Sequence, residues 1–118
     1  MIANKTLSAF LSMTLVALVI TVLAGPPANA QEAAALYSQR CAACHGTTGK
    51  GDGAAGQYLN PKPTDFADSL KGKSDDWIAK AVKGGGVAIG GSPVMPPYAD
   101  LSDDQVKGLV AYMKSFGK

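Results

Sequence analysis

Two long stretches rich in glycine and proline, at residues 46–66 and 84–100, most constrain what this chain can fold into. Long segments without regular structure are uncommon inside a compact domain unless they serve a function or wrap around something. The sequence shows no sustained alternation of apolar and polar residues, which is the pattern of a β-strand. We therefore predict an all-α fold of about three helices, with the two loops packed around a large non-protein group.

Three segments carry helical patterns. The first is predicted at residues 32–43. The second should start after Ser74 as its N-cap and end just before Gly84. The third should start with a capping box over residues 102–105. Its buried face should follow the spacing i, i+3, i+4, i+7, which gives Val106, Leu109, Val110 and Met113.

The N-terminus has the pattern of an export signal. A single lysine precedes a long apolar run, which ends in prolines and the small-residue triplet at 28–30. We predict a signal peptide at residues 1–30, cleaved before Gln31, and one domain at residues 31–118. The apolar run is also just long enough to span a bilayer. We therefore predict export into a bacterial periplasm, with a thylakoid lumen or an uncleaved membrane tether as the alternatives.

The most specific motif is Cys41-Ala42-Ala43-Cys44-His45, which has the spacing of c-type haem attachment. Two thiols one helical turn apart can reach the two vinyl groups on one side of a haem, and the next residue can place its imidazole under the iron. We predict one haem c, attached through Cys41 and Cys44, with His45 as the proximal ligand. A thioredoxin-like pair would need a βαβ setting, a zinc site would need four ligands, and a plain disulfide would not require the histidine.

His45 is the only histidine, so the sixth iron ligand has to be something else. Met95 lies in a loop between prolines, which stiffen the backbone by fixing φ. A stiff loop loses little entropy when its thioether binds a metal. We predict Met95 as the distal ligand. Met113, on the apolar face of the last helix, should serve core packing.

The chain resembles the class I cytochrome c family over essentially all of residues 31–118. The resemblance rests on the motif at 41–45, on Met95-Pro96 in a late loop and on the terminal helix segment 109–114. It implies a cytochrome c-like fold and a carrier of single electrons that is not an enzyme. In the family the first and last helices cross closely, and here Ala33 and Tyr37 would meet Leu109 and Tyr112. Since Ala33 stands where the family often has glycine, we expect a slightly wider crossing.

The resemblance also implies that a proline carbonyl accepts a hydrogen bond from the second ring nitrogen of the proximal histidine. Pro61 and Pro63 are both candidates, and Pro61 is the one we favour from the sequence. Trp77 and Tyr98 are expected to pack near the haem, with a hydrogen bond to a haem propionate as a second possibility.

We expect a soluble, monomeric, exported electron carrier whose partners are redox proteins. A formal net charge of +2 gives no sign of nucleic-acid binding, and no membrane insertion is expected after signal cleavage. The alternative is a catalytic or ligand-sensing haem protein, peroxidase-like or gas-binding, with a labile distal ligand. That alternative would favour polar groups beside the iron, and the late loop offers Ser92 and Tyr98 but no histidine or arginine.

Overall fold

The structure is a computed structural model that describes residue 25 and residues 27–118, so most of the predicted signal peptide lies outside the described residues. The described residues contain helices and no strand, which confirms the all-α prediction. The elements are α1 (Ala28–Arg40), α2 (Ala42–His45), η1 (Ala55–Tyr58), α3 (Phe66–Ser69), α4 (Asp75–Gly84), η2 (Gly86–Ile89) and α5 (Asp103–Ser115). The three longest are the three predicted helices. The short elements α3, η1 and η2 lie in or beside the two predicted loops.

The first helix starts earlier and ends sooner than predicted. It begins at Ala28, where the carbonyl of Pro27 accepts a hydrogen bond from the N–H of Ala30 at 2.8 Å. The prediction had placed the start after the expected cleavage site and overlooked the strong helix propensity of the alanines before it. The helix stops at Arg40 because Cys41 adopts φ −120°, and α2 then carries the rest of the haem-attachment motif.

The middle helix, α4, confirms its predicted N-cap. The hydroxyl of Ser74 accepts a hydrogen bond from the N–H of Trp77 at 3.2 Å. The C-terminal boundary was wrong by one residue, since Gly84 is the last helical residue and Gly85 is the C-cap with φ +73°. Ile78 is among the residues that α4 buries, and Trp77 is half-buried.

The capping box of α5 is present in full. The Ser102 hydroxyl accepts from the N–H of Gln105 at 3.2 Å, and the Gln105 side-chain oxygen accepts from the N–H of Ser102 at 3.0 Å. All four predicted face residues are buried. Both parts of the prediction for this helix, the capping box and the apolar face, are therefore confirmed.

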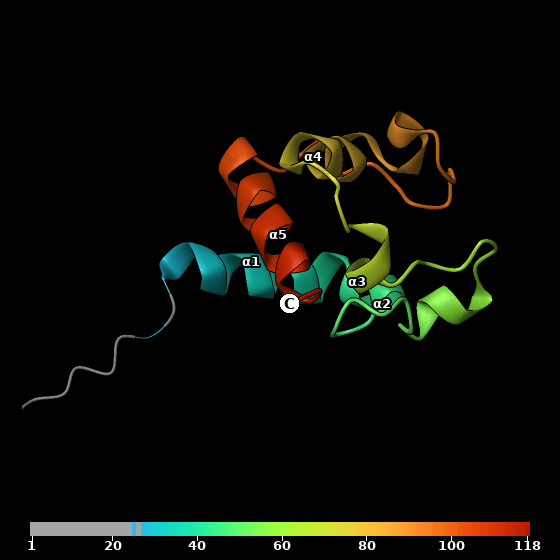
Figure 1. The fold of residues 1–118 in the computed structure, drawn as a ribbon, viewed down its shortest axis with the longest axis horizontal. Helices are drawn as coiled ribbons and strands as arrows, with labels where there is room; N and C mark the ends of the chain where they lie inside the picture. Colours follow the sequence, from blue (N-terminus) through green and yellow to red (C-terminus); the bar gives the residue numbers. More distant parts are fainter. Residues whose placement is uncertain (1–24, 26) are drawn as a thin grey trace, which may run out of the picture.

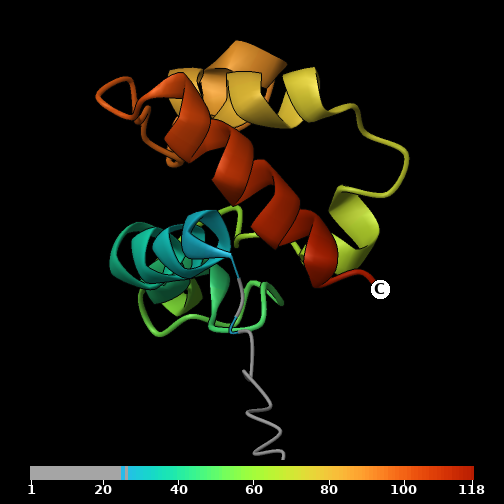
Figure 2. The ribbon, with the colours of Figure 1, turned by 90° about the vertical axis from the view of Figure 1, so that its left-hand side faces the viewer.

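Helix α5 lies between α1 and α4 and contacts both of them (Figure 1, Figure 2). At the crossing with α1, the ring of Tyr37 packs against the ring of Tyr112 with a centroid distance of 5.3 Å. Ala33 faces Gly108, where an added Cβ would lie 3.3 Å from the Ala33 Cβ. The expectation of a wider crossing overlooked this glycine, which leaves room on α5 for the methyl group that α1 carries.

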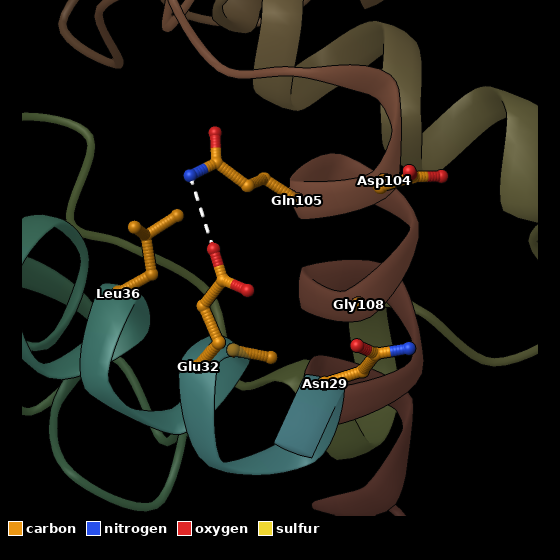
Figure 3. Close-up of a pocket in the computed structure, with 7 residues that line it drawn as sticks. Asn29, Glu32, Leu36, Asp104, Gln105 and Gly108 are labelled. Carbon is orange, nitrogen blue, oxygen red and sulfur yellow. Dashed lines mark hydrogen bonds between the residues drawn. The ribbon is translucent and has the colours of Figure 1, made fainter. Parts of the chain in front are cut away.

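A second contact between α1 and α5 lies one turn away. The side-chain amide of Gln105 donates a hydrogen bond to the carboxylate of Glu32 at 3.2 Å (Figure 3). The hollow beside this contact has a volume of about 30 Å³. That is room for water and not for a larger ligand. Gln105 thus connects the helix cap to α1, and the hollow is not a candidate site.

The hydrophobic core is formed by α1, α3, α4, α5 and the residue before the last capping box. Its buried members are Tyr37, Phe66, Ile78, Val82, Leu101, Val106, Leu109, Val110 and Met113. Several of these also line the large cavity described below, so the core and the cavity share a wall. Within the described residues, no helix is long and apolar enough to cross a membrane.

Candidate functional site

A cavity of about 340 Å³ lies between the segment that carries α2 and α3 and the segment from α4 to residue 98. All eight residues predicted for the site line it. They are Cys41, Cys44, His45, Pro61, Pro63, Trp77, Met95 and Tyr98. The fold therefore brings together residues that four separate parts of the sequence contribute.

The lining of the cavity is mainly apolar. It includes Leu59, Phe66, Leu70, Ile78, Ala81, Val82, Ile89 and Val94. The charged residues in the lining are two cations, Arg40 and Lys62, and no carboxylate is among the lining residues. The volume falls in the range of small-molecule and cofactor sites, which combine apolar walls with a few polar groups. Such a lining suits a flat apolar ligand that carries negative charge at its edge.

The haem-attachment motif lies on one helical turn. The N–H groups of Cys44 and His45 both donate to the carbonyl of Cys41, at 3.2 and 2.9 Å. This turn places both thiols and the imidazole on the wall of the same cavity. Burial raises the pKa of the Cys41 thiol to about 11, so the thiol is neutral near pH 7. A thioredoxin-like nucleophile needs the opposite, a lowered pKa, which argues against that reading of the motif.

The imidazole of His45 is held by an aromatic neighbour. Its ring stacks on the ring of Phe66 with a centroid distance of 4.6 Å and an angle of 29°. Burial lowers the pKa of His45, which favours the neutral form that binds metals. The Nδ1 atom is buried and has no hydrogen-bond partner. Nδ1 therefore makes no hydrogen bond to the carbonyl of Pro61 or Pro63 in this structure. The bond expected from the resemblance stays a prediction for the haem-bound protein.

The glycine-rich segment after the motif folds back against it, as turns close to the site. The N–H of Gly51 donates to the carbonyl of His45 at 2.8 Å. Gly51 adopts φ +75°, and a Cβ on it would overlap the carbonyl oxygen of Pro63. The buried phenol of Tyr37 donates to the carbonyl of Gly46 at 2.7 Å. These contacts hold the main chain around His45 between α1 and the proline-rich segment.

The two methionines of the domain both line the cavity, but from different settings. Met95 is half-buried on a loop that we call the methionine loop, residues 91–98. The N–H of Tyr98 at the end of this loop donates to the carbonyl of Val82 on α4 at 3.0 Å. Met113 is buried within α5 and belongs to the hydrophobic core, in agreement with its predicted packing role.

The two predicted aromatic residues have partners of their own. The phenol of Tyr98 donates to the carbonyl of Arg40 at 2.9 Å, and burial raises its pKa. The ammonium of Lys73 lies 4.6 Å from the centroid of the Trp77 ring, within the range of a cation–π contact. Both residues line the cavity, and the hydroxyl of Tyr98 is already engaged. Their packing against haem stays a prediction.

Ser69 is a cavity residue that the sequence analysis missed. Its hydroxyl oxygen is buried without a hydrogen-bond partner, as is Nδ1 of His45, and both residues line the cavity. Buried polar atoms are normally hydrogen-bonded. These two atoms therefore keep hydrogen-bonding capacity at a site whose thiols and imidazole match the attachment chemistry of haem. A lone serine between the first predicted loop and the second predicted helix carries no signal that could have identified it.

The sequence model of the family described as cytochrome c oxidase, cbb3-type, subunit III, matches residues 28–113. This match begins at the first residue of α1 and ends within α5. No curated protein matches the chain significantly. The chain therefore belongs to this family of c-type cytochrome domains, whose cofactor is covalently bound haem c and whose general role is electron transfer.

Proposed function

We propose that this protein is a soluble, exported carrier of single electrons whose haem iron is ligated by His45 and Met95. The observation that supports this function best is the single cavity lined by Cys41, Cys44, His45 and Met95. When bound, haem supplies one-electron chemistry between ferrous and ferric iron. The residues that line the cavity would hold the haem, shield it from water and supply the ligands of its iron.

Each of the four residues has a distinct role in this proposal. Cys41 and Cys44 would form the thioether bonds, which fix the cofactor to α2. His45 offers a neutral imidazole in a buried setting. Met95 would complete the coordination, and a soft thioether favours the ferrous form and raises the potential. With His45 and Met95 both bound to the iron, no ligand position would remain open for substrate or oxygen.

Met95 is a better candidate than Met113 because of where each side chain is held. Met113 is only 5% exposed and packs in the core, so its removal from there would leave a void. Met95 comes from the α4 side of the cavity, whereas His45 comes from α2. A haem ligated by both would be held from two walls.

For the second nitrogen of His45 we favour the carbonyl of Pro63 over that of Pro61. The support is indirect and comes from Gly51, which bonds the carbonyl of His45 and lies directly against the carbonyl of Pro63. A bond from Nδ1–H to that carbonyl would orient the ring and raise its basicity as a ligand.

Export rests on the N-terminal sequence. A signal at residues 1–30 would place the domain in the bacterial periplasm. There it would exchange electrons with soluble redox partner proteins. A thylakoid lumen or a membrane tether through an uncleaved segment are the alternatives. Monomeric behaviour and partners that are other redox proteins belong to the same proposal.

The deciding experiment compares Met95→Ala with Met113→Ala in haem-loaded protein. Ferric haem with a bound thioether has a weak far-red absorption band. Met95→Ala should abolish this band and allow carbon monoxide to bind, because a labile ligand would take the vacated position. Met113→Ala should keep the band but lower the free energy of unfolding by about 2–5 kcal/mol, as a buried truncation.

The reverse pattern would assign the ligand to Met113, and a band unaffected by either change would exclude methionine. Ready binding of carbon monoxide by the unmodified protein would instead support the alternative function, a ligand-sensing or catalytic haem protein.

A further inference from the structure

Gly86, the first residue of η2 directly after the C-cap of α4, contacts the methionine loop through main-chain hydrogen bonds. The N–H of Gly86 donates a hydrogen bond to the carbonyl of Met95 at 3.1 Å. The carbonyl of Gly86 in turn accepts from the N–H of Gly91 at 2.8 Å. A single residue is therefore bonded both to the first residue of the methionine loop and to Met95 itself.

There is no space for a side chain at this contact. A Cβ on Gly85 would lie 2.7 Å from the carbonyl oxygen of Met95 and 2.9 Å from the nitrogen of Pro97. A Cβ on Gly86 would overlap the carbonyl oxygen of Ser92. The atoms that it would meet belong to the main chain, so they cannot rotate aside as the end of a flexible side chain could.

The methionine loop has few other main-chain supports. Three of its residues, Pro93, Pro96 and Pro97, have no N–H to donate. Its main-chain bond to α4 is the one from Tyr98 to the carbonyl of Val82. The contact at Gly86 is thus the one that fixes the main chain at Met95 itself, a half-buried residue on the cavity wall.

We propose that Gly85 and Gly86 are positioning residues for the haem ligand: they let the backbone of the methionine loop lie directly on the turn between α4 and η2, which sets the reach of the Met95 thioether into the cavity. This inference rests on the proposed ligation by Met95. The sequence pattern indicated only a helix end at Gly84 and a loop after it, and the added role follows from the close approach of two backbones.

The test separates the effect of close contact from the effect of backbone strain by comparing two glycines at the two ends of η2. Gly86 does not have a positive φ, so Gly86→Ala adds a contact with the Ser92 carbonyl and no conformational strain. Gly90 has φ +75° and nothing within 4 Å of an added Cβ, so Gly90→Ala adds strain and no contact. Both variants are made as haem-loaded protein, with far-ultraviolet circular dichroism as a check on folding.

We expect Gly86→Ala to keep its helical signal and its covalent haem but to lose the far-red thioether band and bind carbon monoxide. Gly90→Ala should keep the band and resist carbon monoxide. A Gly86→Ala variant that keeps the band would overturn the proposal. Loss of the band in both variants would also overturn it, since loop strain and not contact would then control the ligand.

A milder variant covers the case in which Gly86→Ala yields no folded protein. A Cβ on Gly91 would lie 3.1 Å from the Gly86 carbonyl oxygen, so Gly91→Ala presses less strongly on the same backbone. It should weaken the band, and an unchanged band would count against the proposal. Met95→Ala, measured alongside, keeps the two hypotheses apart: if that variant retains the band, the ligand assignment fails whatever the glycine variants do.

Discussion

The phenol of Tyr98 donates a hydrogen bond to the main-chain carbonyl of Arg40, 2.9 Å away, across 58 residues of sequence. Arg40 directly precedes the first attachment cysteine, and Tyr98 ends the methionine loop. The guanidinium of Arg40 also lies 6.0 Å from the centre of the Tyr98 ring and pairs with Asp100 at 2.8 Å. These contacts join the two walls of the cavity beside the attachment cysteines Cys41 and Cys44.

The first prediction concerns this link. Tyr98→Phe removes the hydroxyl but keeps the ring, so it should lower the free energy of unfolding by about 1 kcal/mol, the usual net value of one hydrogen bond. Denaturant titration of haem-loaded protein measures the change. Tyr58→Phe is the matched control, because Tyr58 is 90% exposed and should have no measurable effect. Equal effects of the two substitutions would show that the Tyr98 hydroxyl contributes nothing specific.

The same phenol should make stability depend on alkaline pH. Burial raises the pKa of Tyr98 above its ordinary value of 10.0, so the folded protein holds this proton more tightly than the unfolded chain. The stability that Tyr98 contributes is then complete below pH 10.0 and falls as the pH rises through its folded pKa. The difference in unfolding free energy between unmodified protein and Tyr98→Phe should shrink over that window. A difference that stays constant into the alkaline range would contradict this.

Local sequence patterns predicted the local structure well. The cap of α5 is encoded in four consecutive residues, and the N-cap of α4 in Ser74 with the acidic residues after it. The site residues were identified for the same reason, since the attachment motif is contiguous and Met95 stands between prolines. The predicted start of α1 at residue 32 was wrong, since the helix begins at Ala28 and no capping residue in the sequence marks that position.

The remaining features depend on contacts between distant segments, which no local pattern contains. The stacking of Phe66 on His45, the orphaned hydroxyl of Ser69 and the bond from Tyr98 to Arg40 are of this kind. The role of Gly108 is another example. A single glycine inside a helical pattern reads as a weak point, and only the packing of α5 on α1 shows what it accommodates.

The second mutational prediction tests that packing. Gly108→Val should lower the free energy of unfolding by about 1–3 kcal/mol, because extra carbons would be forced against Ala33 in a closely packed crossing. Ala111→Val is the control, since it places the same β-branched residue at an exposed position of α5. The control should change stability by about 0.5 kcal/mol or less. A Gly108→Val protein as stable as the control would show that the crossing has room to spare.

The mature protein should begin at Gln31 and carry one covalent haem. The prediction follows from the triplet at residues 28–30 and from the paired cysteines. Since α1 begins at Ala28, cleavage before Gln31 would remove only the first residues of this helix. Mass spectrometry of protein made in a host that exports and attaches haem gives both answers. A mass that includes residues 1–30 would contradict cleavage, and a mass without haem would contradict attachment.

The last prediction is that the domain depends on haem for its fold. Several core residues also form the cavity wall, so one side of the core packs against the cavity and not against protein. They are Phe66, Ile78, Val82 and Met113. Without haem, these apolar side chains would line a water-accessible cavity of about 340 Å³, and apolar surface left in water forgoes about 25 cal/mol per Å² of stabilisation. A typical domain is stable by only about 5–15 kcal/mol, so the loss of this burial should unfold it.

Cys41→Ser/Cys44→Ser protein without haem should therefore lose most of its far-ultraviolet helical signal. The serines are close in size to the cysteines, so the change removes attachment with little effect on packing. The unmodified chain, made in a host without haem-attachment machinery, is the control and should be unfolded to the same degree. Native helical content in either haem-free protein would show that α1, α4 and α5 pack well enough on their own, and that the cavity closes or is tolerated without its cofactor.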